Sequence, residues 1–148
     1  MPSHVVVQQQ LLLTSVPGIT RWQKPHPGRL KCNINAVFSI VLNRVGIGMC
    51  LRDDEGAYIL AKTMSLSPLV PVNVGKALAL YHALQWIRDM RFDNVDFVVD
   101  SKTTSDAVSS NIIDVTKFSQ IIATCQNTLF SSFTNSRVEF NLSSIYVG

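Results

Sequence analysis

Apolar and polar residues alternate over much of the first half of the chain. From Leu30 to Ile40 every second residue is apolar, which is typical of a strand with one face on a core. Residues 45–52 and 57–64 follow as two further strands, and Gly56 between them suits the positive φ of a hairpin turn. The short connections predict three consecutive antiparallel strands.

The pattern changes to a helical period at Asn73, which we expect to cap a helix that runs to Met90. A fourth alternating strand ends at Asp100, and Ser101 opens a second helix directly after it. A third helix and a short strand over residues 137–140 follow. The apolar face of that helix consists of Phe118, Ile121, Ile122, Cys125 and Leu129. The order βββαβααβ predicts an α/β fold with a mixed five-stranded sheet, antiparallel strands first and parallel strands after them, with helices packed on it.

Length and composition fit one packed domain. The chain has 148 residues, of which 47% are hydrophobic and 16% charged, and this is enough to bury a single substantial core. The net charge of +3 would help the protein approach a polyanion. A charge of this size does not identify a partner by itself.

Cysteines and histidines do not indicate a site. Cys32, Cys50 and Cys125 lie far apart without a Cys-x-x-Cys pair, so zinc spacing is missing and we expect buried thiols in a reducing compartment. The histidines are equally scattered, and neither Ser-His-Asp nor Cys-His chemistry can be argued from them.

The amino terminus is expected to be a poorly ordered leader over residues 1–20, followed by the domain over residues 21–148. The apolar run in the leader is too short and too interrupted to span a bilayer. It also lacks the basic start and cleavage site of a secretory signal, so we expect an intracellular protein, cytoplasmic or nuclear.

Several short motifs follow one another in a characteristic order. They are W-Q-K-P at 22–25, G-R-L-K-C-N-I at 28–34, G-I-G at 46–48, C-L-R-D at 50–53, A-L-A-L at 77–80, D-S-K at 100–102 and N-S-R-V-E-F at 135–140. In this order and spacing they resemble the ribonuclease H-like domains (RNase H type 1) of plant non-LTR retroelements and their genomic descendants, over residues 21–140. The resemblance implies the ribonuclease H-like fold.

The same resemblance implies an activity, a cofactor and a partner. The partner is an RNA–DNA hybrid, and the activity is hydrolysis of its RNA strand with the help of two Mg²⁺ ions. Such a site needs several converging carboxylates, because Mg²⁺ prefers oxygen ligands and two cations repel each other. In the family, acids stand on the first strand, in the first helix and at the end of the fourth strand.

At the three family acid positions this chain has Asn35, Lys76 and Asp100, so only one acid is retained. Asn35 can offer an oxygen but no charge, and Lys76 places an ammonium that competes with a metal ion and can pair with Asp100. We therefore expect Asp100 to be a vestigial metal ligand and Mg²⁺ to bind weakly or not at all. Without the resemblance, the favoured role of Asp100 would be to cap the helix that follows it.

The carboxy-terminal residues 141–148 match neither the loop nor the final helix of the family, so we expect that helix to be missing. The strand before them would then be an exposed edge with apolar side chains such as Val138 and Phe140. Exposed edges of this kind promote self-association.

Three functions remain open from the sequence. The chain can be a hybrid ribonuclease that tolerates Asn35 and Lys76, or a non-catalytic module that binds nucleic-acid backbones through Lys and Arg. It can also be a degenerate retroelement fragment without activity. The substitutions at the acid positions favour an impaired enzyme.

Overall fold

The helices and strands follow the order that the pattern predicts. In the computed structural model, which describes residues 25–109 and 116–140, three strands come first. They are β1 (Leu30–Ser39), β2 (Arg44–Arg52) and β3 (Tyr58–Leu66). The later elements are α2 (Val72–Asp89), β4 (Val95–Val99), α3 (Lys102–Val108), α4 (Lys117–Ser132) and β5 (Arg137–Phe140). The predicted order βββαβααβ is confirmed. The expected leader and the expected loss of a final helix lie outside the described residues.

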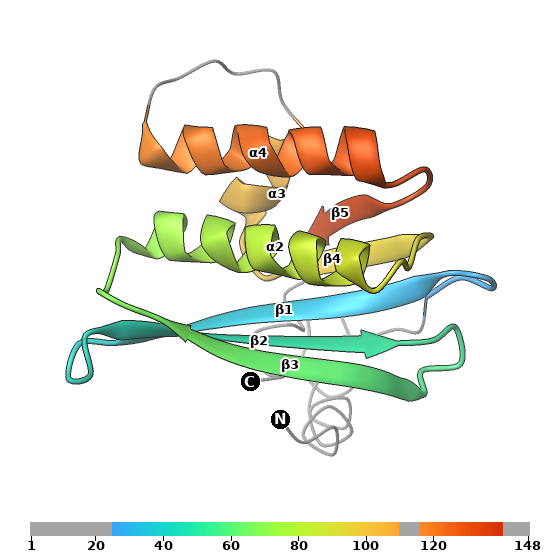
Figure 1. Cartoon of the computed structure of the whole chain (residues 1–148), viewed down its shortest axis with the longest axis horizontal. Coiled ribbons are helices and arrows are strands. Elements are labelled where there is room, and N and C mark those ends of the chain that lie inside the picture. The colour runs from blue at the N-terminus through green and yellow to red at the C-terminus, as the bar shows by residue number, and fades with distance from the viewer. Residues whose placement is uncertain (1–24, 110–115, 141–148) are drawn as a thin grey trace, which may run out of the picture.

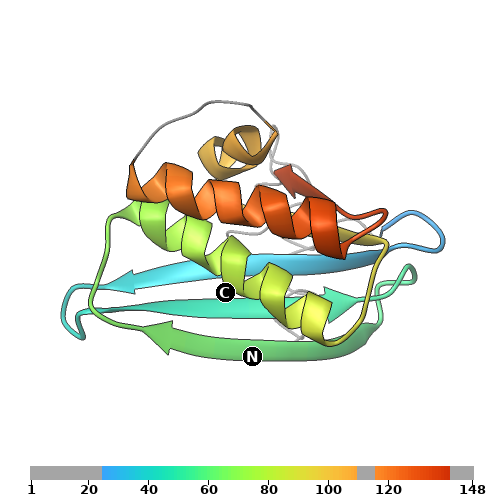
Figure 2. The same ribbon diagram turned by 45° about the horizontal axis from the view of Figure 1, so that its top comes forward.

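The five strands form one mixed sheet with the spatial order β3-β2-β1-β4-β5. The β1–β2 and β2–β3 pairs are antiparallel, whereas β1–β4 and β4–β5 are parallel. Helices α2 and α4 lie side by side over one face of the sheet (Figures 1 and 2). The predicted mixed sheet is therefore confirmed, and β1 is its central strand.

The core lies between this helix layer and the sheet. Alternate residues of β1, such as Cys32 and Ile34, pack with the buried apolar residues of α2. At Gly75 of α2, a Cβ atom would lie 2.6 Å from Cζ of Phe38 in β1. A side chain at position 75 would require the ring of Phe38 to move. None of the described helices is long and apolar enough to cross a membrane.

The polar side of β1 differs from the expected half-buried strand. Lys31, Asn33 and Asn35 are 5%, 3% and 7% exposed, so both faces of the strand are buried. Side chains on a central strand, which has a neighbouring strand on each side, are more buried than those on an edge strand. Burial lowers the pKa of Lys31, and the nearby carboxylates of Glu139 and Asp96 partly oppose that effect.

The predicted cap of the first helix is wrong. Helix α2 begins at Val72 with Pro71 as its N-cap residue, because the first helical hydrogen bond runs from Gly75 N–H to Pro71 O. Asn73 lies inside the first turn, and its Oδ1 accepts from the N–H of Val74 at 2.9 Å. Proline is suited to a helix start for two reasons. Its φ is fixed near the helical value, and the N–H group that it lacks would have no helical partner there.

The three cysteines are buried and unpaired by disulfides, as expected. Burial raises the pKa of all three thiols and brings that of Cys125 to about 12. Thiols of this kind are protonated and unreactive at neutral pH.

Asp93 connects the turn before β4 with the turn before β5. Its carboxylate accepts hydrogen bonds from the N–H groups of Asn94, Thr134 and Asn135 and from the hydroxyl of Ser136. Burial by itself would raise the pKa of Asp93, but these hydrogen bonds outweigh it and hold the pKa at about 2. The charged form is thus bound by the native structure.

Asp96 forms a second, more deeply buried connection. Its carboxylate is 3% exposed and lies 2.7 Å from Nη2 of Arg29, which precedes β1, and 3.0 Å from Nε of Arg137 in β5. Arg29 also donates to the backbone oxygen of Asn135 at 3.0 Å. One carboxylate in β4 therefore binds cations from both neighbouring strand ends.

We expect Asp93 to give the fold a characteristic acid sensitivity. Because its pKa falls from 3.8 to about 2 on folding, its contribution is present above about pH 4 and is lost as the pH falls toward 2. Replacing Asp93 with Asn should therefore lower the free energy of unfolding by about 1–2 kcal/mol at pH 7. Urea denaturation of both proteins between pH 2 and 7 measures this. A difference between wild type and variant that does not shrink in acid would contradict the assignment.

We expect Asp96→Ala to be strongly destabilising, since it leaves Arg29 partly buried without its carboxylate. The loss should be about 3–5 kcal/mol in the free energy of unfolding. Asp106→Ala is the matched control, because Asp106 pairs with Lys102 on the surface, where both side chains are more than half exposed. That change should cost about 0.5 kcal/mol or less. Equal losses in the two variants would contradict the structural role of Asp96.

Candidate functional site

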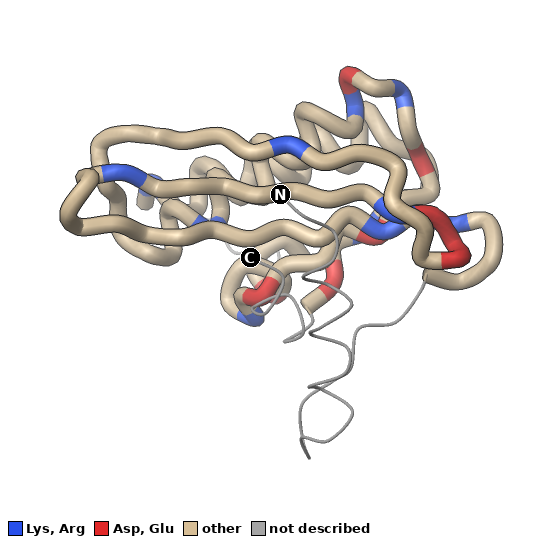
Figure 3. The backbone as a smooth tube through the Cα atoms, turned by 90° about the horizontal axis from the view of Figure 1, so that it is seen from below, with Lys and Arg blue, Asp and Glu red and all other residues tan. Residues whose placement is uncertain are grey.

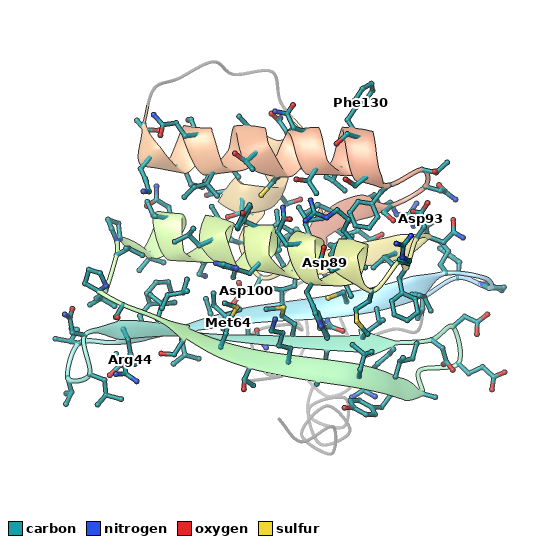
Figure 4. All side chains as sticks on the ribbon, viewed as in Figure 1. Arg44, Met64, Asp89, Asp93, Asp100 and Phe130 are labelled. Atoms are coloured by element: carbon teal, nitrogen blue, oxygen red, sulfur yellow. The ribbon has the colours of Figure 1, made fainter. Side chains whose placement is uncertain are left out.

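An ion pair joins Lys76 of α2 to Asp100 at the carboxyl-terminal end of β4. The Lys76 Nζ atom lies 3.5 Å from Oδ1 of Asp100, and the two side chains are 26% and 13% exposed. Lys76 comes from the second turn of α2, and Asp100 directly follows β4. Asp100 lies beneath α2 (Figure 4). Two residues far apart in sequence thus meet as the resemblance implied.

The structure bears on the helix-cap interpretation of Asp100. Ser101 is the N-cap residue of α3, and its hydroxyl accepts from the N–H of Thr104 at 3.1 Å. The carboxylate of Asp100 instead pairs with Lys76. The helix-cap interpretation of Asp100 is therefore wrong, while the prediction that Ser101 opens the helix is confirmed.

Asn35 lies in β1, the strand next to β4. The parallel register pairs Asn33 with Val98, and continued by two residues it would set Asn35 beside Asp100. Asn35 pairs with Gly48 of β2 and alternates with Ile34, whose side chain packs toward α2. By this alternation Asn35 faces away from α2. The structure brings Lys76 and Asp100 into contact and places Asn35 in the adjoining strand.

The charges at these three positions do not suit divalent ions. One ammonium, one carboxylate and one neutral amide carry no net charge. Within residues 25–109 and 116–140 no group of three or more His, Cys, Asp or Glu residues could hold a metal ion. A pair of Mg²⁺ ions needs several anionic oxygen ligands to offset their mutual repulsion. The residues present therefore do not fit the two ions that the resemblance implied.

One polar group in α3 gives no signal in the sequence. Thr104 is fully buried, and its Oγ1 has no hydrogen-bond partner. A buried hydroxyl without a partner costs free energy. A threonine within the polar stretch 102–106 gives no sequence signal for this, because its burial results from the packing of α3 between its neighbours.

The ends of the sheet differ in charge. The β2–β3 turn carries Asp53, Asp54 and Glu55 in a row, whereas the β1–β2 hairpin at the opposite end carries Arg44 and no acid (Figure 3). Arg44 is exposed, as is Lys62 on β3. Acidic residues are thus concentrated away from the hairpin end of the sheet.

A profile of reverse transcriptase-like proteins matches residues 33–144, which is most of the chain. Asn35, Lys76 and Asp100 all fall within this match. A comparison with curated protein sequences found no significant match.

Solved structures of ribonucleases H have the same fold. RNase H1 from the halophilic archaeon Halobacterium salinarum superposes with a TM-score of 0.66 at 15% identity, over 76% of this chain and 85% of that chain. The N-terminal RNase H domain of rv2228c from Mycobacterium tuberculosis gives 0.65 at 13% identity, over 80% and 92%. LC11-RNase H1 in complex with an RNA/DNA hybrid gives 0.64 at 13% identity, over 76% and 84%. These similarities confirm the ribonuclease H-like fold.

Proposed function

The chain belongs to the reverse transcriptase-like family of ribonuclease H-like domains, and from this premise we propose that it binds nucleic acid without cleaving it. The proposed ligand is the RNA–DNA hybrid, as in the complex of LC11-RNase H1. The proposed domain spans residues 21–148, which the family match over residues 33–144 supports. We also propose that the chain is retroelement-derived and catalytically impaired, a pseudoenzyme.

The observation that carries the proposal is the ion pair between Lys76 and Asp100. Asp100 is the one acid at the three positions, and its carboxylate already faces a cation 3.5 Å away. A divalent ion would have to displace or repel the ammonium of Lys76 before it could bind Asp100. Neutral Asn35 supplies no charge that would compensate.

Without bound metal ions the domain would lose the hydrolysis of RNA but keep its fold. The sheet and helices superpose on RNase H1 structures with TM-scores of 0.64 to 0.66. Affinity for a nucleic acid comes largely from contacts between Lys or Arg and phosphates, which need no metal. The net charge of +3 and the exposed Arg44 are consistent with such binding.

We expect the natural chain to show no Mg²⁺-dependent cleavage of a labelled RNA–DNA hybrid. The double change Asn35→Asp with Lys76→Glu would, together with Asp100, put a carboxylate at all three family acid positions and should restore Mg²⁺ affinity first, because affinity needs only the ligands. Calorimetric titration with Mg²⁺ measures the affinity, and gel analysis of the labelled RNA measures cleavage.

The control for this experiment is the double revertant with Asp100→Asn added. It should lose the restored Mg²⁺ affinity, since the third carboxylate is gone. Robust Mg²⁺-dependent cleavage by the unmodified chain, abolished by Asp100→Asn, would contradict the proposal and make the protein an active ribonuclease.

We further propose that the protein self-associates through β5. This strand is at one edge of the sheet, and its partly buried Val138 and the 37% exposed Phe140 are apolar. An edge strand offers unpaired backbone groups as well as apolar side chains to another copy.

Phe140→Lys should accordingly shift the protein toward monomer in light scattering at increasing concentration. The matched control is Phe130→Lys, because Phe130 is 92% exposed on α4 and points away from the sheet (Figure 4). A monodisperse wild-type monomer would refute self-association. Dissociation by Phe130→Lys alone would place the interface on α4.

A further inference from the structure

We infer that the ammonium of Lys76 is itself a phosphate ligand, which takes over at this site the charge that metal ions would supply. The inference rests on the proposed binding of nucleic acid and names the residue that makes the contact. It rests on two observations. The residues Asn35, Lys76 and Asp100 do not fit a two-metal site, and the Lys76–Asp100 ion pair has a geometry that leaves donors available.

The first argument is the accessibility of Lys76. Its side chain is 26% exposed, which is more than the 12% of Arg29 in the structural pair with Asp96. An ammonium has three donors. Among the described residues its ion pair is with a single oxygen of Asp100, so donors remain for an incoming anion.

The second argument is the looseness of the pair. Arg29 and Asp96 approach to 2.7 Å and share two hydrogen bonds, whereas Lys76 and Asp100 stay 3.5 Å apart. A charge-assisted hydrogen bond of full strength is about 2.7–2.9 Å long. Asp100 therefore holds the ammonium in place without saturating it, and an oxygen of a phosphodiester monoanion can bind the free donors.

The third argument concerns the ligand class. Phosphodiester groups are anions whose binding to lysine needs neither a metal ion nor a base-specific contact. Lys76 lies within the reverse transcriptase-like match, and its ammonium lies beside Asp100 at the end of β4. A nucleic-acid backbone that passes this end would contact the ammonium of Lys76 instead of metal ions. Binding should thus be independent of Mg²⁺.

The experiment measures the anisotropy of a labelled RNA–DNA hybrid with the full chain, in EDTA and in Mg²⁺, at several salt concentrations. The wild type should bind equally well in both. Lys76→Gln should weaken binding roughly tenfold at low salt and reduce the slope of log affinity against log salt by about 1. Lys76→Arg should retain most of the affinity, and Asp100→Asn should increase it, because the competing carboxylate charge is gone.

Arg88→Gln is the matched control. Arg88 lies on the same helix, also forms an ion pair, with Asp89 at 3.2 Å, and is 41% exposed. It is separated from Lys76 by about 18 Å of helix, so its replacement should leave affinity and salt slope unchanged. The double variant Lys76→Gln with Asp100→Asn avoids an unpaired carboxylate and should bind more weakly than Asp100→Asn alone.

The outcomes separate this inference from the proposed function. Hybrid binding that is equally strong in wild type, Lys76→Gln and the double variant would overturn the role of Lys76 but leave nucleic-acid binding intact. Binding that requires Mg²⁺ would also overturn it. If the wild type binds no hybrid in either buffer, both the inference and the proposed function are wrong.

Discussion

The parallel pairing of β1 with β4 is the contact on which the rest of the structure depends. It joins two strands that are separated in the chain by β2, β3 and the whole of α2, and it makes β1 the central strand of the sheet. A parallel connection needs a long crossover, which α2 provides. Because α2 must span the sheet in this way, its second turn comes to lie over the end of β4, where Lys76 meets Asp100.

The carboxylates of Asp93, Asp96 and Asp100 lie close together in sequence but make different contacts. Asp93 and Asp96 sit at the beginning of β4, where short hydrogen bonds and ion pairs fasten it to β1, β5 and the turn before β5. Asp100 sits at its other end and makes one longer ion pair. The tight contacts explain how the sheet is held. The looser one explains how the opposite end can remain open to an anionic ligand.

The order of elements could be read from the sequence because alternation and helical spacing are local properties of the chain. The first cap could not, since Pro71 and Asn73 are both acceptable near a helix start and only the backbone path decides between them. The hydrogen bonds of Asp93 were equally hidden, because their partners at Thr134 to Ser136 come close only when β5 pairs with β4. The same holds for the two arginines around Asp96.

The sequence by itself determined the strands and helices, the family resemblance and the replacement of two acids by Asn35 and Lys76, because residue types and spacing carry that information. Tertiary structure alone decided the burial of both faces of β1 and the 3.5 Å separation of Lys76 and Asp100. Whether a lysine opposes a metal ion or binds an aspartate depends on distance, which falls outside any linear pattern. That distance results from the packing of α2 on β1 and β4, which brings together residues that lie far apart in the sequence.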